Sequence, residues 1–379
     1  MGKDNTQGQP ADSNAENFAP QKSSNNLDNI DRVSLLREGQ TQKPSDNTQM
    51  AQAQTQDKSG DGPLSDYSNK HLPQFDKRDV EKLKEVGQGT DGPQRPAETF
   101  ELNLKNRSAN HGHPDAIVYL PKNFDPSKPV NMVVYNHGWR STASQSYNDS
   151  KLGAQMSNAP PNTILVIPEW QARPGANKDS DQGRLKQPGG YSNMLEEVLD
   201  KTPGMKGKKL QDLGDISIIS HSAGYNPTNA MLADKNIASK VKSLTMLDSL
   251  YNSSGADNWI KQNAGALASG QKQYTNISFD TSGESRAQAQ RVKDIMRQAG
   301  YSTGQLHEDF KNGNKKLTAD QIAEHSIVFK HSQVLSGRKG AGEHGSMPDL
   351  YVREVEKAAA MKGRQRRSDI EEPVKKRAA

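Results

Sequence analysis

The sequence predicts an α/β domain with a mostly parallel sheet, and three observations lead to that prediction. From about residue 96, short β-rich runs alternate with helical ones, which is the order of elements in α/β domains. The runs VVY, ILVI and SIIS are short and continuously apolar, as parallel strands covered on both faces require. The segment 96–361 is long enough to bury a substantial core without the residues before it.

We expect eight strands and six helices in this domain. The strands are predicted at residues 98–104, 115–120, 131–136, 162–167, 215–220, 241–247, 273–279 and 325–331. The helices are predicted near residues 143–156, 191–201, 223–234, 255–266, 285–298 and 349–361. Because strands and helices alternate along the chain, we expect the helices to lie on the faces of one sheet.

Residues 1–95 have a different texture. Over the whole chain only 31% of residues are hydrophobic and the mean hydropathy is −0.96. Much of this deficit lies in residues 1–75, which are rich in Gln, Asn, Ser and Asp. Such a segment buries too little apolar surface to offset its ordering entropy, which is about 1–2 kcal/mol per residue. We expect residues 1–95 to be a disordered polar region and linker, with one short helix at 76–86.

The chain's net charge of +5 comes largely from its end. Residues 362–379 hold seven Lys and Arg against three Asp and Glu, and we expect them to form a basic flexible tail. The preceding domain is close to neutral and has no aromatic residues interleaved with a basic stripe, so nucleic acid is not the expected partner. A chain that did bind DNA through this tail would show strongly salt-sensitive binding.

Composition excludes several other classes. The sequence has no cysteine, so it holds no disulfide, thiolate metal site or cysteine nucleophile. It has no run of about 18 apolar residues and no apolar leader at its start, so we expect neither a membrane span nor a Sec signal. The expected location is the cytoplasm by default, and export by a non-Sec route stays open.

The segment Ser-His-Ser-Ala-Gly at residues 220–224 carries the strongest chemical signal. It follows a strand and precedes a helix, so it is close to the nucleophile elbow G-x-S-x-G, a sharp turn that lifts a serine above the sheet. Ser222 is the candidate nucleophile. Gly224 meets the requirement for a small residue, and Ser220 stands where glycine is usual. A strand–helix turn without chemistry is the alternative.

A His-Gly pair follows the third predicted strand. The glycine lets the backbone turn so that the N–H of Trp139 faces the same point as the N–H of Ala223. Two such donors stabilise a tetrahedral oxyanion by about 3–4 kcal/mol each. His137 is expected to support this loop by hydrogen bonding.

Residues from roughly 97 to 360 therefore resemble an α/β-hydrolase-fold serine hydrolase, through the motifs NHGW, SHSAG, LDSLY and EHGSMP. In that fold the triad follows in the order serine, acid, histidine. The resemblance implies an eight-stranded α/β-hydrolase sheet. Asp248, which ends the sixth strand, is the preferred acid, and Asp280 and Glu284 after the seventh strand remain alternatives.

Four histidines follow the acid candidates. His344 lies in a glycine-rich loop just before the last helix, which resembles the usual place of the catalytic histidine in this fold. It would take the proton of Ser222 and return it to the leaving group. His325 and His331 flank the last strand and His307 lies in a polar linker, so these three are less suited to the role.

Metal and cofactor sites are not expected. His111 and His113 have no companion carboxylates at ligand spacing, which favours a turn at a strand edge over a metal site. The sequence contains neither GxGxxG nor GxxxxGK[ST].

A long loop after the fourth strand indicates a substrate pocket. Trp170 and Arg173 in this loop, with Trp139 and Arg140 beside the oxyanion donors, suggest an apolar wall with cationic groups. This favours polar or acidic acyl groups over long lipid chains. Tyr225 either faces the site or packs at the start of its helix.

The sequence thus predicts a serine hydrolase that cleaves an ester, or less readily an amide, in a small acyl substrate. The alternative is a catalytically silent binding protein of the same fold. In that case the polar N-terminal region would contact a protein partner.

Overall fold

A computed structural model describes residues 97–172 and 181–378 of the chain, with side chains described as far as residue 363. The expectations for residues 1–95, and the position of Arg173, lie outside the described residues. None of the helices in the described part of the chain has the length and apolarity that a bilayer span requires.

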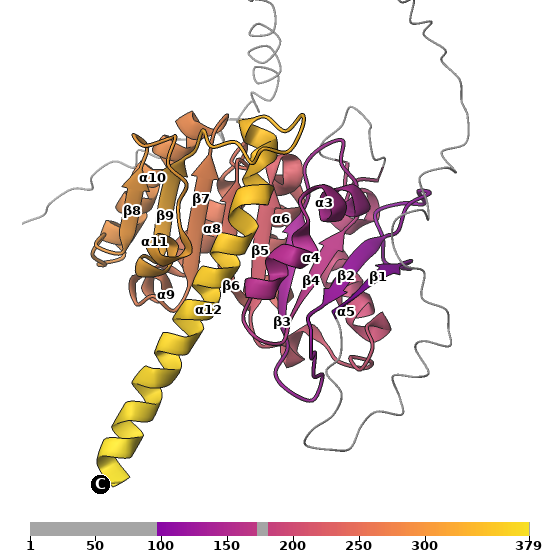
Figure 1. Cartoon of the computed structure of the whole chain (residues 1–379), viewed down its shortest axis with the longest axis horizontal. Coiled ribbons are helices and arrows are strands. Elements are labelled where there is room, and N and C mark those ends of the chain that lie inside the picture. The colour runs from indigo at the N-terminus through magenta and orange to yellow at the C-terminus, as the bar shows by residue number, and fades with distance from the viewer. Residues whose placement is uncertain (1–96, 173–180, 379) are drawn as a thin grey trace, which may run out of the picture. The chain divides into compact units, whose positions relative to one another are not determined.

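One sheet of nine strands forms the centre of the described domain (Figure 1). In chain order the strands are β1 (Glu98–Leu102), β2 (Ala116–Leu120), β3 (Asn131–Asn136), β4 (Thr163–Pro168), β5 (Ile216–His221), β6 (Val241–Leu247), β7 (Gln273–Ser278), β8 (Leu306–Asp309) and β9 (Ile327–His331). Their spatial order is β1-β2-β4-β3-β5-β6-β7-β9-β8. Strands β1 and β2 run antiparallel to their neighbours, and all other pairs are parallel.

All eight predicted strands are present, and the α/β-hydrolase fold class is confirmed. The expected number of strands was wrong, because β8 adds a ninth strand at the edge of the sheet. Its sequence, Leu-His-Glu-Asp, is polar and only partly buried. An edge strand pairs through its backbone on one side, so its side chains carry no apolar pattern that a sequence would reveal.

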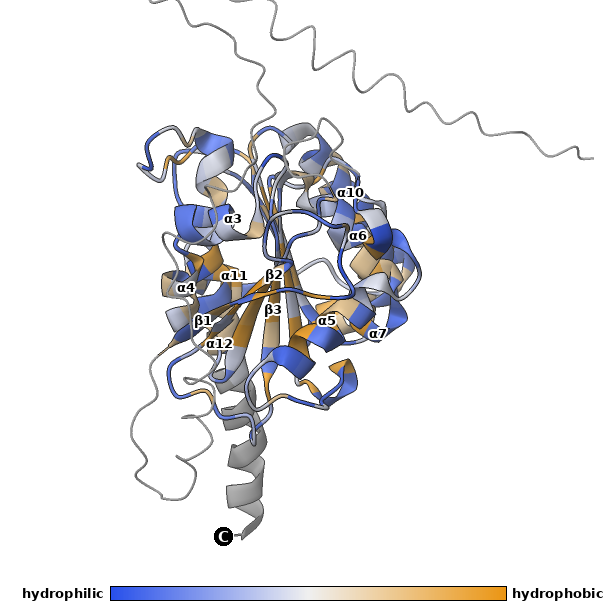
Figure 2. Ribbon diagram, turned by 90° about the vertical axis from the view of Figure 1, so that its right-hand side faces the viewer, coloured by the Kyte–Doolittle hydropathy of each residue, from blue (hydrophilic) through white to orange (hydrophobic). Residues whose placement is uncertain are grey.

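Helices cover both faces of the sheet (Figure 2). In chain order they are α3 (Ala143–Asp149), α4 (Leu152–Gln155), α5 (Gly190–Lys201), α6 (Tyr225–Ala233), α7 (Lys235–Ala238), α8 (Ser254–Gln262), α9 (Ala264–Ala268), α10 (Ser282–Gln298), α11 (Ala319–Glu324) and α12 (Glu343–Ala378), with 3₁₀ turns at Met156–Asn158, Gly183–Lys186, Leu210–Asp212 and Ser222–Gly224. Helices α3, α4, α11 and α12 pack on one face and α5 to α10 on the other. This two-layer cover explains why the central strands are apolar on both faces.

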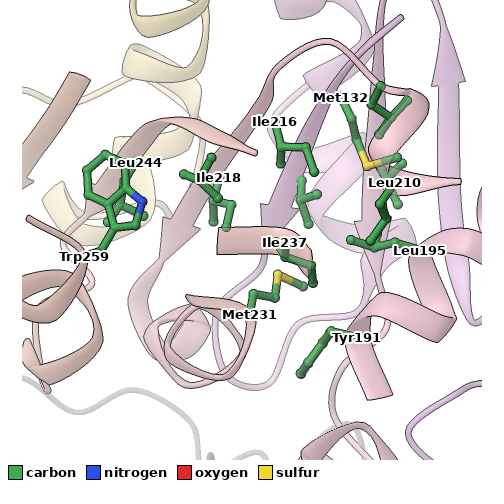
Figure 3. Packing of buried hydrophobic residues seen from close by; sticks show 14 of the residues in the cluster. Met132, Tyr191, Leu195, Leu210, Ile216, Ile218, Met231, Ile237, Leu244 and Trp259 are labelled. Atoms are coloured by element: carbon green, nitrogen blue, oxygen red, sulfur yellow. The ribbon is translucent and has the colours of Figure 1, made fainter. Parts of the chain in front are cut away.

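The larger of the two cores lies on the α5–α10 face. Ile216 and Ile218 of β5 and Leu244 of β6 contribute to it from the strands, with Met231 of α6 and Trp259 of α8 from the covering helices (Figure 3). All five residues are at most 2% exposed. Because helices pack on both faces of these strands, the carboxyl ends of the strands hold the residues that follow them in fixed positions.

The last helix is longer than the sequence predicts. A helix was expected near residues 349–361 with a flexible tail after it, whereas α12 runs from Glu343 to Ala378 and includes the basic segment. Figure 1 shows its second half extending beyond the sheet. The segment 362–378 is rich in Lys, Arg and Glu, which favour helix, and the backbone continues the docked first half without a break.

Candidate active site

A strained turn presents Ser222 at the carboxyl end of the central strand β5. Ser222 has φ = 52°, in the left-handed region that L-residues other than glycine rarely adopt. The 3₁₀ turn Ser222–Gly224 then leads directly into α6. A Cβ on Gly224 would lie 2.3 Å from the carbonyl oxygen of Asn136 in β3, so only glycine fits there. This strand–turn–helix geometry is that of a nucleophile elbow.

Ser220, which replaces the usual glycine, takes part in a buried hydrogen-bond chain. Ser249 Oγ donates to the carbonyl oxygen of Ser222 over 2.6 Å, and lies 2.5 Å from Ser220 Oγ. Because the single proton of the Ser249 hydroxyl is already used, Ser220 must donate to Ser249. These hydrogen bonds link the elbow to Ser249, the residue after Asp248, and hold the backbone of Ser222 in place.

Asp248 and His344 are joined by a short hydrogen bond. His344 Nδ1 lies 2.6 Å from Asp248 Oδ2. The carboxylate is fully buried and also accepts from the N–H groups of Phe279 and Thr281, each over 2.9 Å, and from the Thr281 hydroxyl over 2.8 Å. Burial opposes ionisation of Asp248, but His344 and these donors outweigh it and hold its pKa below the ordinary value.

The two alternative acids, Asp280 and Glu284, are less well placed to hydrogen-bond His344. Asp280 Oδ2 is 3.7 Å from His344 Nδ1, and its side chain is half exposed. Its pKa is raised, first by partial burial and then by the charge of Asp248. Glu284 is exposed in the first turn of α10. Of the three candidates, Asp248 is the one whose carboxylate hydrogen-bonds His344.

His221, the residue between Ser220 and Ser222, supports the first turn of α12, which contains His344 and was expected from the sequence to be a loop. Its ring lies 4.8 Å from the His344 ring, centroid to centroid. Its Nε2 donates to the carbonyl oxygen of His344 over 3.1 Å. Burial, followed by the charge of His344, lowers the pKa of His221 to about 3. His221 is therefore a neutral donor over the working pH range and fixes the backbone that carries His344.

Burial also disfavours the charged form of His344, but the hydrogen bond and the negative charge of Asp248 outweigh it. The pKa of His344 is consequently raised above its ordinary value. The partner carboxylate occupies Nδ1, which leaves Nε2 to exchange protons with another group.

Ser222 and His344 line the same pocket. Within residues 97–172 and 181–378, no hydrogen bond joins the Ser222 hydroxyl to His344. In hydrolases without a bound ligand this bond is often long and tightens when substrate arrives. The shared pocket places both groups where one substrate can reach them.

The loop after β3 approaches the elbow closely. A Cβ on Gly138 would lie 3.1 Å from Ser222 Cβ, so glycine is needed for the approach. Beneath the loop, fully buried His137 donates from Nδ1 to the carbonyl oxygen of Gly138 over 2.9 Å and faces Glu169 Oε1 at 3.2 Å. Glu169 Oε2 also accepts from the N–H of Ala143. His137 thus supports the loop.

The structure places the residues that the sequence predicted for the pocket in three different environments. Trp139 lines the pocket and is 39% exposed, with the Arg140 guanidinium stacked 4.2 Å from its ring centroid. Trp170 was wrongly expected there, because it is fully buried and donates to the carbonyl oxygen of His137 over 3.0 Å. Tyr225 packs against the core and lies near Tyr251, with 5.8 Å between ring centroids.

The other downstream histidines lie elsewhere. His307 in β8 stacks on His325, with 4.9 Å between ring centroids, and His331 stacks on Phe279. His307 and His325 occupy the edge of the sheet that β8 forms. None of these three contacts Asp248 through a hydrogen bond in the described part of the chain.

A metal ion has little room among these groups. Ligand atoms of Asp248, Asp280 and His344 lie within 4.8 Å of one another. The Asp248 oxygens, however, already accept from three backbone N–H groups, the Thr281 hydroxyl and His344, and these donors occupy the lone pairs a metal would need. His111 Nε2 faces Asp115 Oδ1 at 3.5 Å, and its Nδ1 bonds His113.

Sequence reasoning missed Glu169, Ser249 and the role of His221. Glu169 directly follows the last residue of β4, and Ser249 lies two residues after the end of β6. Functional side chains gather at the carboxyl ends of such strands, and this position was the available signal. Nothing local indicated that Glu169 would face His137, because the two belong to loops after neighbouring strands.

No family model and no curated protein matches the sequence. Among solved structures, the chain is similar to a feruloyl esterase module from Clostridium thermocellum, with 15% identity over 70% of this chain and 87% of that one and a TM-score of 0.45. It is also similar to an S-formylglutathione hydrolase from Agrobacterium tumefaciens (13% identity, 50% and 78% coverage, TM-score 0.32) and to the fluorophosphonate-binding serine hydrolase FphF of Staphylococcus aureus (14%, 53% and 87%, 0.35). The sheet order and the turn at Ser222 give the chain the α/β-hydrolase fold.

Proposed function

We propose that the protein is a serine hydrolase that cleaves esters, with Ser222 as nucleophile, His344 as general base and Asp248 as the acid that orients it. One observation carries the proposal. The buried Asp248 carboxylate and His344 Nδ1 are 2.6 Å apart, and His344 lines the same pocket as a serine held at positive φ on a strand–helix turn. This set of residue types in this relation is that of a triad.

The proposed reaction has two halves. His344 Nε2 takes the proton of Ser222 Oγ as the oxygen attacks the ester carbonyl, and the N–H groups of Trp139 and Ala223 stabilise the oxyanion. His344 then gives the proton to the departing alcohol oxygen, which leaves an acyl group on Ser222. Water repeats the sequence with the carbonyl of the acyl-enzyme and releases the acid. An ester is favoured over an amide because an alcohol leaves more readily than an amine.

Three features support these roles. Asp248 stays ionised, because donors surround it, and it stabilises the imidazolium that forms. His221 and the chain from Ser220 through Ser249 hold the backbones of His344 and Ser222. The buried pair of His137 and Glu169 supports the loop that carries the N–H of Trp139.

A fluorophosphonate probe tests the assignment. The wild-type protein should be labelled, and Ser222→Ala should lose the label while its circular dichroism stays unchanged. Ser157→Ala is the matched control, because Ser157 is an exposed serine and should keep full labelling. Labelling that persists in Ser222→Ala would contradict the proposal.

The second candidate, a silent binding protein of the same fold, is favoured by one observation. The Ser222 hydroxyl and His344 are not hydrogen-bonded within residues 97–172 and 181–378. A wild-type protein that is folded yet takes no label on Ser222 and hydrolyses no ester would establish this candidate instead.

A further inference from the structure

One wall of the pocket at Ser222 carries polar groups that the proposed reaction does not use. Tyr135 lies near the end of β3, Asp149 and Ser150 lie at the end of α3, and Arg338 comes from the loop that precedes α12. All four line the pocket together with Ser222 and His344.

Two of these groups are hydroxyls on largely buried side chains, and they have no hydrogen-bond partner among the described residues. Tyr135 is 1% exposed and Ser150 is 6% exposed. Neither hydroxyl makes a hydrogen bond with any other residue in the described ranges, and both remain open to the pocket. Ser141 and Ser146 on the same wall differ, because their hydroxyls bond each other over 2.8 Å. Both side chains are held in place by burial, and both hydroxyls face the pocket, where a ligand can hydrogen-bond them.

The charges on this wall do not favour an anion. Arg338 Nε is 2.8 Å from Asp349 Oδ2, and its NH2 group donates to the carbonyl oxygen of Gly345 over 2.7 Å. Only a looser contact of 3.8 Å joins Arg338 NH1 to Asp149 Oδ2. Arg338 thus supplies one positive charge against the two negative charges of Asp149 and Asp349, so these three groups together carry a net negative charge. A second anion brought to this wall would be repelled by the Asp149 carboxylate.

The pocket is also small, with a volume of about 180 Å³. A volume of this size encloses a group of a few carbon and oxygen atoms. The small volume of the pocket, the two open hydroxyls and the net negative charge of Arg338, Asp149 and Asp349 together fit a compact neutral polar group.

Resting on the function proposed above, we propose that Tyr135 and Ser150 bind a neutral, hydroxyl-bearing group beside the scissile ester, and that Asp149 disfavours anionic groups. A substrate hydroxyl can donate to one of the two protein hydroxyls and accept from the other. An analogue without that hydroxyl leaves both unpaired, and such sites discriminate strongly against it. Of the polar and acidic groups that the sequence suggests, this site therefore favours the neutral polar ones.

Two pairs of esters test the proposal and locate the hydroxyl-bearing group. The acyl pair is 4-nitrophenyl butyrate and 4-nitrophenyl 3-hydroxybutyrate, and the alcohol pair is propyl butyrate and glycerol monobutyrate. In one pair the hydroxylated member should have a kcat/KM about tenfold higher, and that pair shows which side of the ester enters the pocket. The monosuccinate ester of 4-nitrophenol should be cleaved about tenfold less efficiently than the butyrate.

Variants then assign the effect to residues. Tyr135→Phe and Ser150→Ala should bring the hydroxylated-to-plain ratio close to one. Tyr147→Phe is the matched control, because the Tyr147 hydroxyl bonds Thr99 and lies outside the pocket lining, and it should keep the wild-type ratio. Asp149→Asn should raise the monosuccinate-to-butyrate ratio several-fold.

The outcomes separate this inference from the function on which it rests. If wild-type Ser222 takes the fluorophosphonate label but both pairs give ratios near one, the hydroxyl site is overturned and the hydrolase assignment stands. The same follows if Tyr135→Phe and Ser150→Ala leave the ratio at its wild-type value. A wild-type protein that takes no label overturns the hydrolase assignment itself, and this inference with it.

Discussion

Two buried carboxylates in different regions of the domain have opposite surroundings. Asp248, at the carboxyl end of β6, is 0% exposed and accepts hydrogen bonds from His344, from three backbone N–H groups and from the Thr281 hydroxyl. Glu356, in the middle of α12, is 2% exposed, and its Oε2 has no hydrogen-bond partner among the described residues.

The pKa values of the two groups differ accordingly. Burial raises the pKa of Glu356 to about 8, whereas the donors around Asp248 outweigh burial and lower its pKa. Hydrogen-bond donors, rather than depth, therefore decide whether a buried carboxylate carries charge. The charged carboxylate, Asp248, lies beside the proposed base, whereas the carboxyl group of Glu356, in α12, stays neutral until mildly alkaline pH.

The largest effect is expected from removing the charge of Asp248. Asp248→Asn should lower kcat about 10⁴-fold, because an amide does not stabilise the imidazolium or hold the required tautomer of His344. The measurement is kcat for 4-nitrophenyl butyrate, with circular dichroism to check folding. Asp280→Asn is the matched control and should cost less than about tenfold. A greater loss in the control than in Asp248→Asn would transfer the role to Asp280.

The opposite carboxylate should respond in stability. Unfolded Glu titrates near pH 4.5 and folded Glu356 near 8, so between these values the native chain keeps a proton that the unfolded chain has released. The neutral Glu356 side chain therefore costs the native state nothing below about pH 4.5. The free energy of unfolding falls as the pH rises from about 4.5 to about 8. Glu356→Gln should therefore raise the free energy of unfolding by on the order of 5 kcal/mol at pH 9 and leave it unchanged at pH 4.

Denaturant unfolding at the two pH values measures this difference. Glu354→Gln serves as the control, because Glu354 bonds Lys316 and the N–H of Ala319 and its replacement should not stabilise the protein at pH 9. Equal stabilities of wild type and Glu356→Gln at pH 9 would show that Glu356 has partners when it is charged.

A smaller effect is expected where a hydroxyl supplies the hydrogen bond. Ser249→Ala removes the donor to the carbonyl oxygen of Ser222 and leaves Ser220 without its partner. We expect a loss of about 1–2 kcal/mol in stability and about a tenfold decrease in kcat, with KM little changed, because the elbow is held less firmly. Ser249→Thr, which keeps the hydroxyl, should recover most of the kcat. Unaltered kcat in Ser249→Ala would limit this residue to a structural role.

The smallest effect is expected in the pH profile. His344 must be neutral to accept a proton, and its pKa is raised above the ordinary 6.5. Hence kcat/KM should fall as the pH drops through a value above 6.5. The charge of Asp280 contributes to this rise, so Asp280→Asn should move the acid limb to lower pH by a fraction of a unit. A limb below 6.5 in the wild type would mean that Asp248 does not stabilise the imidazolium.

The sequence alone predicted the strands that helices cover on both faces, because burial on both sides leaves a continuous apolar run. It also indicated the elbow, since a strand, a small-residue turn and a helix are adjacent in the chain. It failed for β8, whose polar side chains hide an edge strand. It failed for Trp170, because a tryptophan in a loop looks the same whether its indole faces solvent or a backbone carbonyl.

What the sequence determined about this protein is local: the apolar strands, the turn at Ser222 and the short set of acids and histidines that follow it. The choice among them was made by the tertiary structure, because Asp248 and His344 are 96 residues apart in the chain. Their contact depends on how the carboxyl end of β6, an interior strand of the sheet, meets the start of α12. The same holds for the open hydroxyls of Tyr135 and Ser150. Whether a polar group has a partner depends on every segment folded around it, and residue order does not record that.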